Sequence, residues 1–347
     1  MHKILVTGGC GYIGSHTIVD LIDNGFDVIS ADNLSNSSEE VLDGIETITG
    51  RRVKNYAIDL CDLEATEAMF REHSDLVGVI HFAALKHVGE SVDQPIRYFR
   101  NNLNSLINVL DCMVRYEVPN IIFSSSCSVY GNASELPVTE NTPLEEAESP
   151  YARTKQMGEQ IIQDFSHRHP RHNNILLRYF NPAGAHESAK MGESPTTPAS
   201  NLVPVITEAA IGKRKELVVF GDDYDTRDGS CIRDYIHVMD LANAHTKALQ
   251  YVIAGKQEGP VEIFNLGIGE GVTVLEALNS FMAVTGEDLP YRVGPRRPGD
   301  VVAIYANYKK AADQLGWQPQ RDVNDIMRTA WAWEKVRSNA VKEEPKV

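Results

Sequence analysis

Tyr151 and Lys155 have the residue types and the spacing that proton transfer requires. Ser149-Pro150 is typical of a helix start, with serine as the N-cap and proline at the first helical position. A spacing of four residues then places the phenol and the ammonium on one face of that helix. A phenol with its ordinary pKa near ~10 is a poor base at neutral pH, and an adjacent ammonium favours the phenolate. The pair therefore suggests general-base catalysis, although such pairs also occur by chance on helix surfaces.

Three consecutive serines give this pair a context. Ser124-Ser125-Ser126 end an apolar run at residues 121–124, which predicts a buried strand. Ligands of doubly wound sheets bind at the carboxyl ends of the strands, so these hydroxyls are expected at a ligand-facing edge. Ser126 would hold a substrate hydroxyl, and Lys155 would also hold a nicotinamide ribose. Together with Tyr151 they predict proton and hydride transfer at a carbinol carbon.

A glycine-rich turn supplies a candidate site for the hydride carrier. Residues 8–14 read GGCGYIG and satisfy both G-x-G-x-x-G and G-x-x-G-x-x-G. Gly8, Gly11 and Gly14 allow a tight turn, close backbone approach to a pyrophosphate, and close packing of strand and helix. The amino end of the following helix adds free N–H groups. We include Tyr12 and Ile13, which open that helix, among the cofactor contacts.

Asp32 sets the type of dinucleotide. It closes the next predicted strand, where a carboxylate accepts from both adenosine ribose hydroxyls and repels a 2′-phosphate. Asn33 and Leu34 follow instead of arginine, so NAD is expected and not NADP. Other predicted cofactor contacts leave the third and fourth strands, with Asp59 placed to reach the adenine amino group: Asp59, Leu60, Phe82, Ala83, Ala84, Leu85 and Lys86.

The elements that must position these groups alternate over the first 180 residues. Apolar, β-rich runs occur at residues 4–7, 28–31, 56–60, 77–82, 121–124 and 175–179, with helical spacing between them. Nearly continuous apolar strands indicate a parallel sheet covered by helices on both faces. The fold class predicted is α/β, a doubly wound parallel (Rossmann) sheet of six or seven strands with a second, smaller α/β substrate domain.

The amino-acid composition and the pattern of predicted elements change after residue 181. Residues 182–236 are rich in Pro, Gly, Ser, Asp and Glu, with one predicted helix at 203–210 and one strand at 217–220. Residues 237–266 predict a return to the sheet, followed by helices at 274–284 and around 330–333 and a frayed end at 341–347. We therefore expect an NAD-binding domain at 1–181, with the return segment, and a substrate domain at 182–347.

Composition excludes several classes of function. The chain has 33 Lys and Arg against 48 Asp and Glu, a net charge of −15, which disfavours nucleic-acid and anionic-membrane partners. No run reaches the ~20 apolar residues of a membrane span, and the opening residues do not resemble a secretory signal. Five scattered cysteines predict reduced thiols and a cytoplasmic protein. His167, His169 and His172 have no neighbouring carboxylate, and no metal site is expected.

These motifs resemble a known family. The glycine turn, the serine at the end of the fifth strand and Tyr151-x-x-x-Lys155 resemble the extended short-chain dehydrogenase/reductases. Residues 7–17, 32–37, 81–91, 177–186 and 233–238 are similar to the UDP-glucose 4-epimerase family, and the resemblance covers residues 3 to about 335. It implies that Tyr151 takes the proton of the sugar 4-hydroxyl while tightly held NAD takes the C4 hydride. The 4-keto sugar turns over and regains that hydride on its other face, which interconverts UDP-galactose and UDP-glucose.

The resemblance also implies further contacts. Additional cofactor anchors are Asn36, Ser37, Asp59, Lys86, Asn101 and Phe180. The UDP-hexose would be held, besides Lys86, Ser126 and Tyr151, by Asn181, Asn201, Leu202, Phe220, Arg233, Tyr235, Arg297, Asp300 and Ile304. Arginine suits a diphosphate because its fork forms paired, charge-assisted hydrogen bonds. Family members form homodimers through the helices at 98–116 and 151–165, so a homodimer is expected.

Alternatives remain at three points. Ile304 is smaller than the aromatic residue that excludes an N-acetyl group in the family, so we hypothesise that UDP-N-acetylglucosamine is also accepted. A nucleotide-sugar 4,6-dehydratase would carry an Asp-Glu pair after the strand-five hydroxyl, where this sequence has Cys127-Ser128. A non-catalytic NAD sensor would usually have lost the tyrosine or the lysine.

Overall fold

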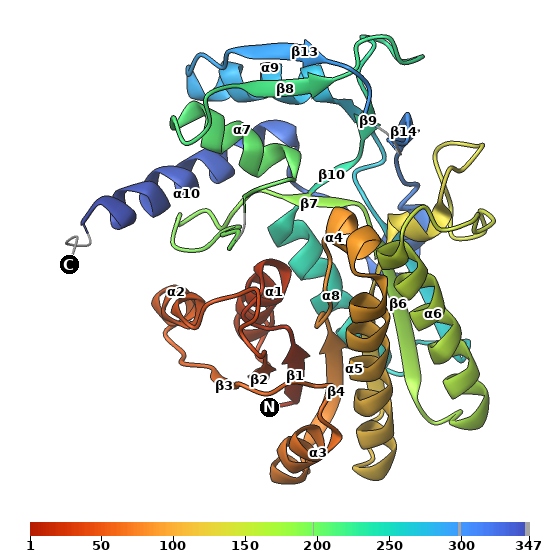
Figure 1. Cartoon of the computed structure of the whole chain (residues 1–347). Coiled ribbons are helices and arrows are strands. Elements are labelled where there is room, and N and C mark those ends of the chain that lie inside the picture. The colour runs from red at the N-terminus through yellow and green to blue at the C-terminus, as the bar shows by residue number, and fades with distance from the viewer. Residues whose placement is uncertain (197, 298–299, 344–347) are drawn as a thin grey trace.

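A seven-stranded, all-parallel sheet is the centre of the computed structural model, which describes residues 1–196, 198–297 and 300–343 (Figure 1). Its strand order is β11-β6-β5-β4-β1-β2-β3. The strands are β1 (Lys3–Thr7), β2 (Asp27–Ala31), β3 (Lys54–Tyr56), β4 (Leu76–His81), β5 (Asn120–Ser126), β6 (Asn173–Tyr179) and β11 (Val261–Leu266). The order reverses direction between β1 and β4, which is the switch point where doubly wound sheets bind ligands. The predicted α/β class is confirmed.

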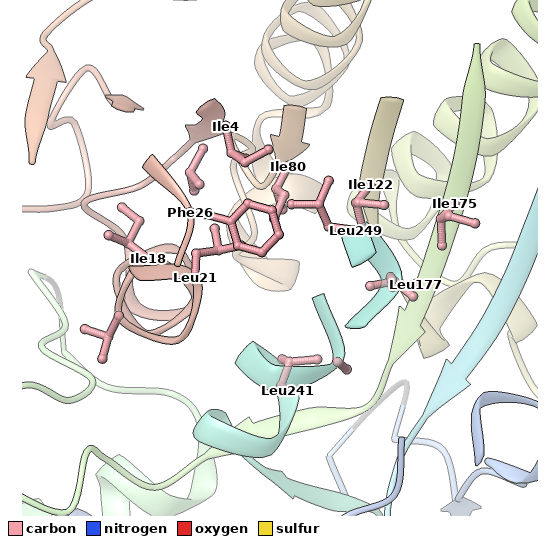
Figure 2. Close-up of a cluster of buried hydrophobic side chains, with 14 of the residues drawn as sticks. Ile4, Ile18, Leu21, Phe26, Ile80, Ile122, Ile175, Leu177, Leu241 and Leu249 are labelled. Carbon is pink, nitrogen blue, oxygen red and sulfur yellow. The ribbon is translucent and has the colours of Figure 1, made fainter. Parts of the chain in front are cut away.

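Two apolar layers bury the faces of this sheet. Helices α1 (Tyr12–Asp23), α2 (Glu40–Thr49) and α8 (Val238–Ile253) cover one face. Helices α3 (Leu63–Glu72), α5 (Pro95–Arg115) and α6 (Pro150–Arg168) cover the other, and the short α4 (Val88–Asp93) precedes α5. Figure 2 shows Leu21 of α1 and Leu249 of α8 pointing toward strand residues such as Ile80. Continuous apolar strands are therefore buried on both faces, as a parallel sheet requires.

The C-terminal part adds a smaller layer beyond the carboxyl ends of the strands (Figure 1). A third apolar cluster joins α7 (Leu202–Ala210), α9 (Val274–Thr285), α10 (Val323–Glu343) and β8 (Leu217–Phe220). The remaining elements are β7 (Asn181–Ala183), β9 (Ile232–Arg233), β10 (Tyr235–His237), β12 (Val272–Thr273), β13 (Tyr291–Gly294), β14 (Ala303–Ile304) and the short helices η1 (Cys127–Tyr130) and η2 (Ala311–Leu315). The strands of the C-terminal part form three small sheets, β10-β7, β12-β9-β14 and β13-β8.

Three sequence expectations need correction. The third strand ends at Tyr56, where a strand was expected at 56–60: the Ile58 N–H donates back to the Tyr56 carbonyl, and the Asp59 carboxylate accepts from the Cys61 N–H in the turn that follows. The region at 182–236 also holds β7, β9 and β10, which at two or three residues are too short to show periodicity. Helix α10 continues to Glu343, so residues 341–343 of the expected frayed end are helical, and residues 344–347 lie outside the described residues.

Other expectations agree with the structure. The strand at 217–220 and the helices predicted at 203–210 and 274–284 are present within a residue, and residues 237–266 supply α8 and β11 of the main sheet. All five cysteines are free. Within the described residues, no helix combines the length and apolar character that a membrane span needs.

Candidate active site

Helix α6 brings Tyr151 and Lys155 to the carboxyl end of β5. The Ser149 hydroxyl accepts from the Ala152 N–H at 3.1 Å, and Pro150 occupies the first turn, as predicted. The Lys155 Nζ lies 5.9 Å from the centroid of the Tyr151 ring. Gly158 allows the helix to approach the strand, because a Cβ there would lie 2.7 Å from the Phe123 ring. The predicted shared face is confirmed.

Each of the three serines has a partner. The Lys155 ammonium donates to the Ser124 carbonyl at 2.6 Å and to its hydroxyl at 3.1 Å. The Ser125 hydroxyl donates to the Glu159 carboxylate. The Ser126 hydroxyl accepts from the N–H and the hydroxyl of Ser128, at 3.2 and 3.0 Å. Hydroxyls at the end of a core strand are thus satisfied, which removes the cost of burying them.

The expected lowering of the tyrosine pKa is not produced by the lysine. Burial raises the pKa of the Tyr151 phenol to about 12, and the neighbouring Ser126 hydroxyl opposes this only in part. Burial lowers the pKa of Lys155 to about 8, against the opposing charge of Glu159. Desolvation is the largest cause of both shifts, and the Lys155 ammonium is directed to the Ser124 carbonyl. The chain's own groups therefore keep the phenol protonated at neutral pH.

The glycine turn forms a tight backbone cradle at the start of α1. Gly8 has a φ of +67°, and its N–H donates to the Ala31 carbonyl at 2.8 Å. A Cβ on Gly14 would lie 2.2 Å from the Gly8 carbonyl oxygen, and one on Gly8 would lie 2.9 Å from the Ala83 nitrogen. Glycine is required at both positions, and the amino end of α1 is open to an anion.

Asp32 gathers the next group of predicted cofactor residues. Its Oδ1 accepts from the Leu34 N–H at 2.9 Å and the Ser37 hydroxyl at 2.8 Å, and its Oδ2 accepts from the Cys10 N–H at 3.1 Å. A carboxylate has about four acceptor positions, so capacity for a ribose hydroxyl remains. Asn33 and Asn36 are exposed on the same turn.

The segment after β4 is held beside the cradle. The Phe82 and Ala83 N–H groups donate to Thr7, at its carbonyl and its hydroxyl. Buried Asn102 accepts from the Leu85 N–H at 2.8 Å and donates to the Thr154 hydroxyl of α6 at 3.1 Å. Asn102 was not among the predicted site residues, although the adjacent Asn101 was. Asp59 is exposed on its turn and Leu60 is buried beneath it.

Five of the predicted UDP residues meet in the C-terminal part: Phe220, Arg233, Arg297, Asp300 and Ile304. The Arg297 guanidinium lies 2.7 Å from the Asp300 carboxylate and 5.5 Å from the centroid of the Phe220 ring. Arg233 lies 3.9 Å from the same carboxylate and pairs with Ile304 between β9 and β14. Arg233 and Arg297 thus share one acidic partner. Buried Tyr235 lies on β10, which pairs with β7 so that Tyr235 is opposite Asn181.

Glu193 links the two sets of residues and was not predicted. Its carboxylate accepts from the Asn201 side chain at 3.2 Å and lies 3.7 Å from the Lys86 ammonium. It thereby connects Lys86, which is predicted to contact both cofactor and substrate, to Asn201, which precedes Leu202 at the start of α7. No motif pointed to Glu193, and its partner Lys86 is far away in sequence. Phe180 is buried in a cluster with Ile304, Val129 and Tyr130.

One surface cavity lies away from this chemistry. A surface cavity of about 310 Å³ is lined by residues 133–135, 139, 141–143 and 145, none of them a predicted site residue. In the described part of the chain, no group of three or more His, Cys, Asp and Glu is arranged to hold a metal. His169 and His172 instead pack against Phe165, at ring distances of 4.7 and 5.2 Å. The candidate site is therefore defined by its side chains and not by cavity volume.

Comparison with known proteins agrees with these motifs. A family model described as GDP-mannose 4,6 dehydratase matches residues 5–330. The chain is 45% identical to a UDP-glucose 4-epimerase of Bacillus subtilis over 98% of both chains. The structure of UDP-glucose 4-epimerase from Bifidobacterium longum in complex with NAD⁺ and UDP is 45% identical, with a TM-score of 0.92 over 97% of this chain and 99% of that one. The enzyme from Stenotrophomonas maltophila with bound NAD and formylated UDP-arabinopyranose is 42% identical, with a TM-score of 0.95 over 98% and 100%. The chain belongs to the UDP-glucose 4-epimerase family.

Proposed function

We propose that this protein interconverts UDP-galactose and UDP-glucose by transient oxidation at sugar C4 with a tightly bound NAD. The observation that carries the proposal is the meeting of Tyr151, Lys155 and Ser126 at the sheet edge that also carries the glycine cradle. The relatives named as UDP-glucose 4-epimerases, similar along almost their whole length, support it. The neighbours crystallised with NAD support the choice of cofactor.

The cradle residues fit NAD. The close approaches at Gly8 and Gly14 leave backbone where a side chain would block a pyrophosphate, and Asp32 keeps acceptor capacity for a ribose. Bound NAD supplies a hydride acceptor and a positive charge. We assign its adenosine end to the Asp32 turn, with Asn33, Leu34, Asn36, Ser37, Asp59 and Leu60, and its nicotinamide end to residues 82–86, Asn101, Phe180, Tyr151 and Lys155.

Tyr151 is the proposed proton acceptor. Because burial holds its pKa at about 12, a phenolate at neutral pH requires added positive charge beside the ring. Lys155, with a pKa of about 8, is largely protonated there and contributes part of that charge. The Ser126 hydroxyl, fixed by Ser128, would orient the sugar hydroxyl toward the phenolate. Tyr151 then receives the 4-hydroxyl proton as the C4 hydride leaves and returns it when the hydride comes back.

The UDP moiety is assigned to the C-terminal part. Arg233 and Arg297, held by one carboxylate, supply the fork geometry that a diphosphate favours. These local cations overcome the repulsion expected from a net charge of −15. We propose that residues 1–181 with the return segment at 237–266 form the NAD domain, and that the rest of 182–347 forms the UDP-sugar domain, with Asn181, Asn201, Leu202, Phe220 and Tyr235 completing the site.

A cytoplasmic homodimer is part of the proposal. Ile96 and Ile107 on α5 are 66% and 47% exposed and lie on the helix through which we expect dimerisation. Paired burial of such side chains is favourable at about 25 cal/mol per Å². Free cysteines at all five positions are consistent with a reducing compartment.

Turnover without added cofactor is the test of function. Purified protein mixed with UDP-galactose is expected to form UDP-glucose with no NAD added, and trapped reduced cofactor is expected to appear as absorbance in the reduced-nicotinamide band. A need for fresh NAD at each turnover would contradict tight binding. A flat spectrum without product would instead support an NAD sensor.

A second sugar is favoured by one observation. Ile304 is buried beside Phe180 in an apolar cluster, at the position where an aromatic side chain would restrict an N-acetyl group. We therefore propose that UDP-N-acetylglucosamine is also epimerised. Assaying it beside UDP-glucose tests this, and the absence of any N-acetylated product would limit the enzyme to the plain hexoses.

Replacement of Arg233 should weaken substrate binding. Arg233→Ala is expected to raise the Kd for UDP about 10- to 100-fold, the scale of about 1.5 to 3 kcal/mol for a charged hydrogen bond. Calorimetric titration with UDP measures it. Arg296→Ala is the matched control, because Arg296 is half-exposed and pairs with Asp223. Equal affinities for Arg233→Ala and wild type would place the diphosphate elsewhere.

A further inference from the structure

A buried ion pair lies next to β5, the strand that ends in the three serines. Glu159 of α6 and Arg178 of β6 are 1% and 3% exposed. The guanidinium donates to both carboxylate oxygens, with Nε–Oε1 and Nη2–Oε2 distances of 2.9 and 2.6 Å. This is the paired geometry that makes arginine–carboxylate contacts strong.

The pair extends into a hydrogen-bond network across five elements. The Ser125 hydroxyl of β5 donates to Glu159. Arg178 Nη1 donates to the Tyr130 hydroxyl of η1 at 3.1 Å, and that hydroxyl donates to the Asn265 side chain of β11 at 2.6 Å. Helix α6 is thereby fixed to β5, where the adjacent Ser124 accepts from Lys155 and the adjacent Ser126 is the residue proposed to hold the substrate hydroxyl.

Stability alone does not explain these charges. Replacing a buried ion pair by apolar residues of similar volume is often neutral or stabilising. The surrounding layer is otherwise made of residues such as Ile162, Phe123 and Leu176. Glu159, however, lies one helical turn beyond Lys155 and two turns beyond Tyr151.

We propose that Glu159 is a positioning residue for the epimerase reaction: it fixes α6 on β5 through Ser125 and supplies a negative charge one turn from Lys155, while Arg178 holds that carboxylate in place through two hydrogen bonds. The inference rests on the proposed function, in which Lys155 acts as a cation. It is supported by the charge of Glu159 opposing the burial that lowers the pKa of Lys155.

Few other charges face these groups. Burial lowers the pKa of His81 on β4 to about 3 and raises that of Tyr130 to about 12, so both are neutral near pH 7. On the helices, the groups packed around Lys155 and Glu159 are Tyr151 of α6, Asn102 of α5 and Tyr130 of η1. On the strands they are His81 of β4, Ser124 and Ser125 of β5, Arg178 and Tyr179 of β6, and Asn265 of β11, whose N–H donates to Glu140. Arg178 and Lys155 are therefore the cations that the Glu159 carboxylate faces.

The titration of Lys155 tests the proposal directly. In the purified protein, ¹³C-labelled at the lysine ε-carbons, the Lys155 signal is assigned by its loss in Lys155→Arg. In Glu159→Gln its titration midpoint is expected to fall by about one pH unit or more. Since protonated Lys155 is the active form, the alkaline limb of turnover should move to lower pH by the same amount.

Two variants separate charge from structure. In Glu159→Gln/Arg178→Met the melting temperature should recover, because no unpaired charge remains buried, while the Lys155 midpoint stays low. Asp240→Asn is the matched control, since Asp240 is a buried carboxylate paired with Arg321 on the opposite face of the sheet. It should lower the melting temperature and leave the Lys155 midpoint unchanged.

Specific outcomes would overturn the proposal. An unchanged Lys155 midpoint in Glu159→Gln, or a double variant that restores midpoint and melting temperature together, would leave the pair a purely structural role. If Glu159→Gln does not fold, Glu159→Asp retains the charge and should keep the wild-type midpoint at a lower melting temperature, and a shifted midpoint there would refute the charge effect. Because the titration needs no substrate, a wild-type protein that fails to epimerise would refute only the proposed function.

Discussion

Tyr151→Phe is expected to lower turnover of UDP-galactose by about 10²-fold or more while leaving NAD bound. The substitution removes the phenol oxygen that accepts the sugar proton and keeps the ring, and general-base catalysis contributes about 10² to 10⁴ in rate. The Lys155 contacts to Ser124 do not involve the lost hydroxyl, so the cofactor side of the site should persist. Steady-state turnover and the NAD released on denaturation measure the two effects.

The control for this variant is another buried tyrosine. Tyr251→Phe removes a hydroxyl from α8, on the opposite face of the sheet from α6. It is expected to leave turnover within a few-fold of the wild type. If Tyr151→Phe behaves like Tyr251→Phe, another group accepts the proton and the assignment of Tyr151 is wrong.

Local sequence signals predicted the parts of the fold that depend on short-range physics. Apolar runs located five of the seven strands of the main sheet within a few residues, and the Ser149-Pro150 cap located the start of α6. The third strand was misplaced because Asp59 turns the chain with a side-chain hydrogen bond. Strands of two residues, such as β9, form only through pairing with distant partners and carry no periodic signal.

The electrostatics of the site could not be predicted from spacing. The direction of the Tyr151 pKa shift depends on burial, which a sequence does not display, and burial outweighs the opposing effect of the Ser126 hydroxyl. Glu159 and Arg178 meet only because α6 packs across β5 and β6, and Glu193 joins Lys86 to Asn201 across a long stretch of chain. A motif specifies residue types within one short stretch of the sequence, whereas these contacts depend on how separate elements pack together.

The reaction class required both lines of reasoning. Spacing and strand edges led to a hydride-transfer site, and the epimerase outcome came from the family resemblance and the relatives. The matching family model is described as a dehydratase, and a dehydratase catalyses an elimination. The residues of this chain do not support an elimination mechanism. The two residues after Ser126 are Cys127 and Ser128, and Ser128 serves to fix the Ser126 hydroxyl. Neither position offers a carboxylate for removal of a C5 proton.

Gly14→Ala is expected to abolish tight NAD binding. The new Cβ would lie 2.2 Å from the Gly8 carbonyl oxygen and 2.9 Å from the Gly9 Cα, and backbone atoms cannot move aside as a flexible side chain can. Either the turn or the start of α1 must shift, and a misplacement of about 1 Å can cost on the order of 10²-fold in rate. Turnover without added NAD should therefore fall by at least that factor, and the protein should purify without cofactor.

Gly25→Ala is the control at the other end of α1, because its φ of +83° imposes a strain of about 1 to 2 kcal/mol but no heavy atom lies within 4 Å of the new Cβ. If both variants lose stability equally and both retain NAD, close backbone packing at Gly14 is not what holds the pyrophosphate.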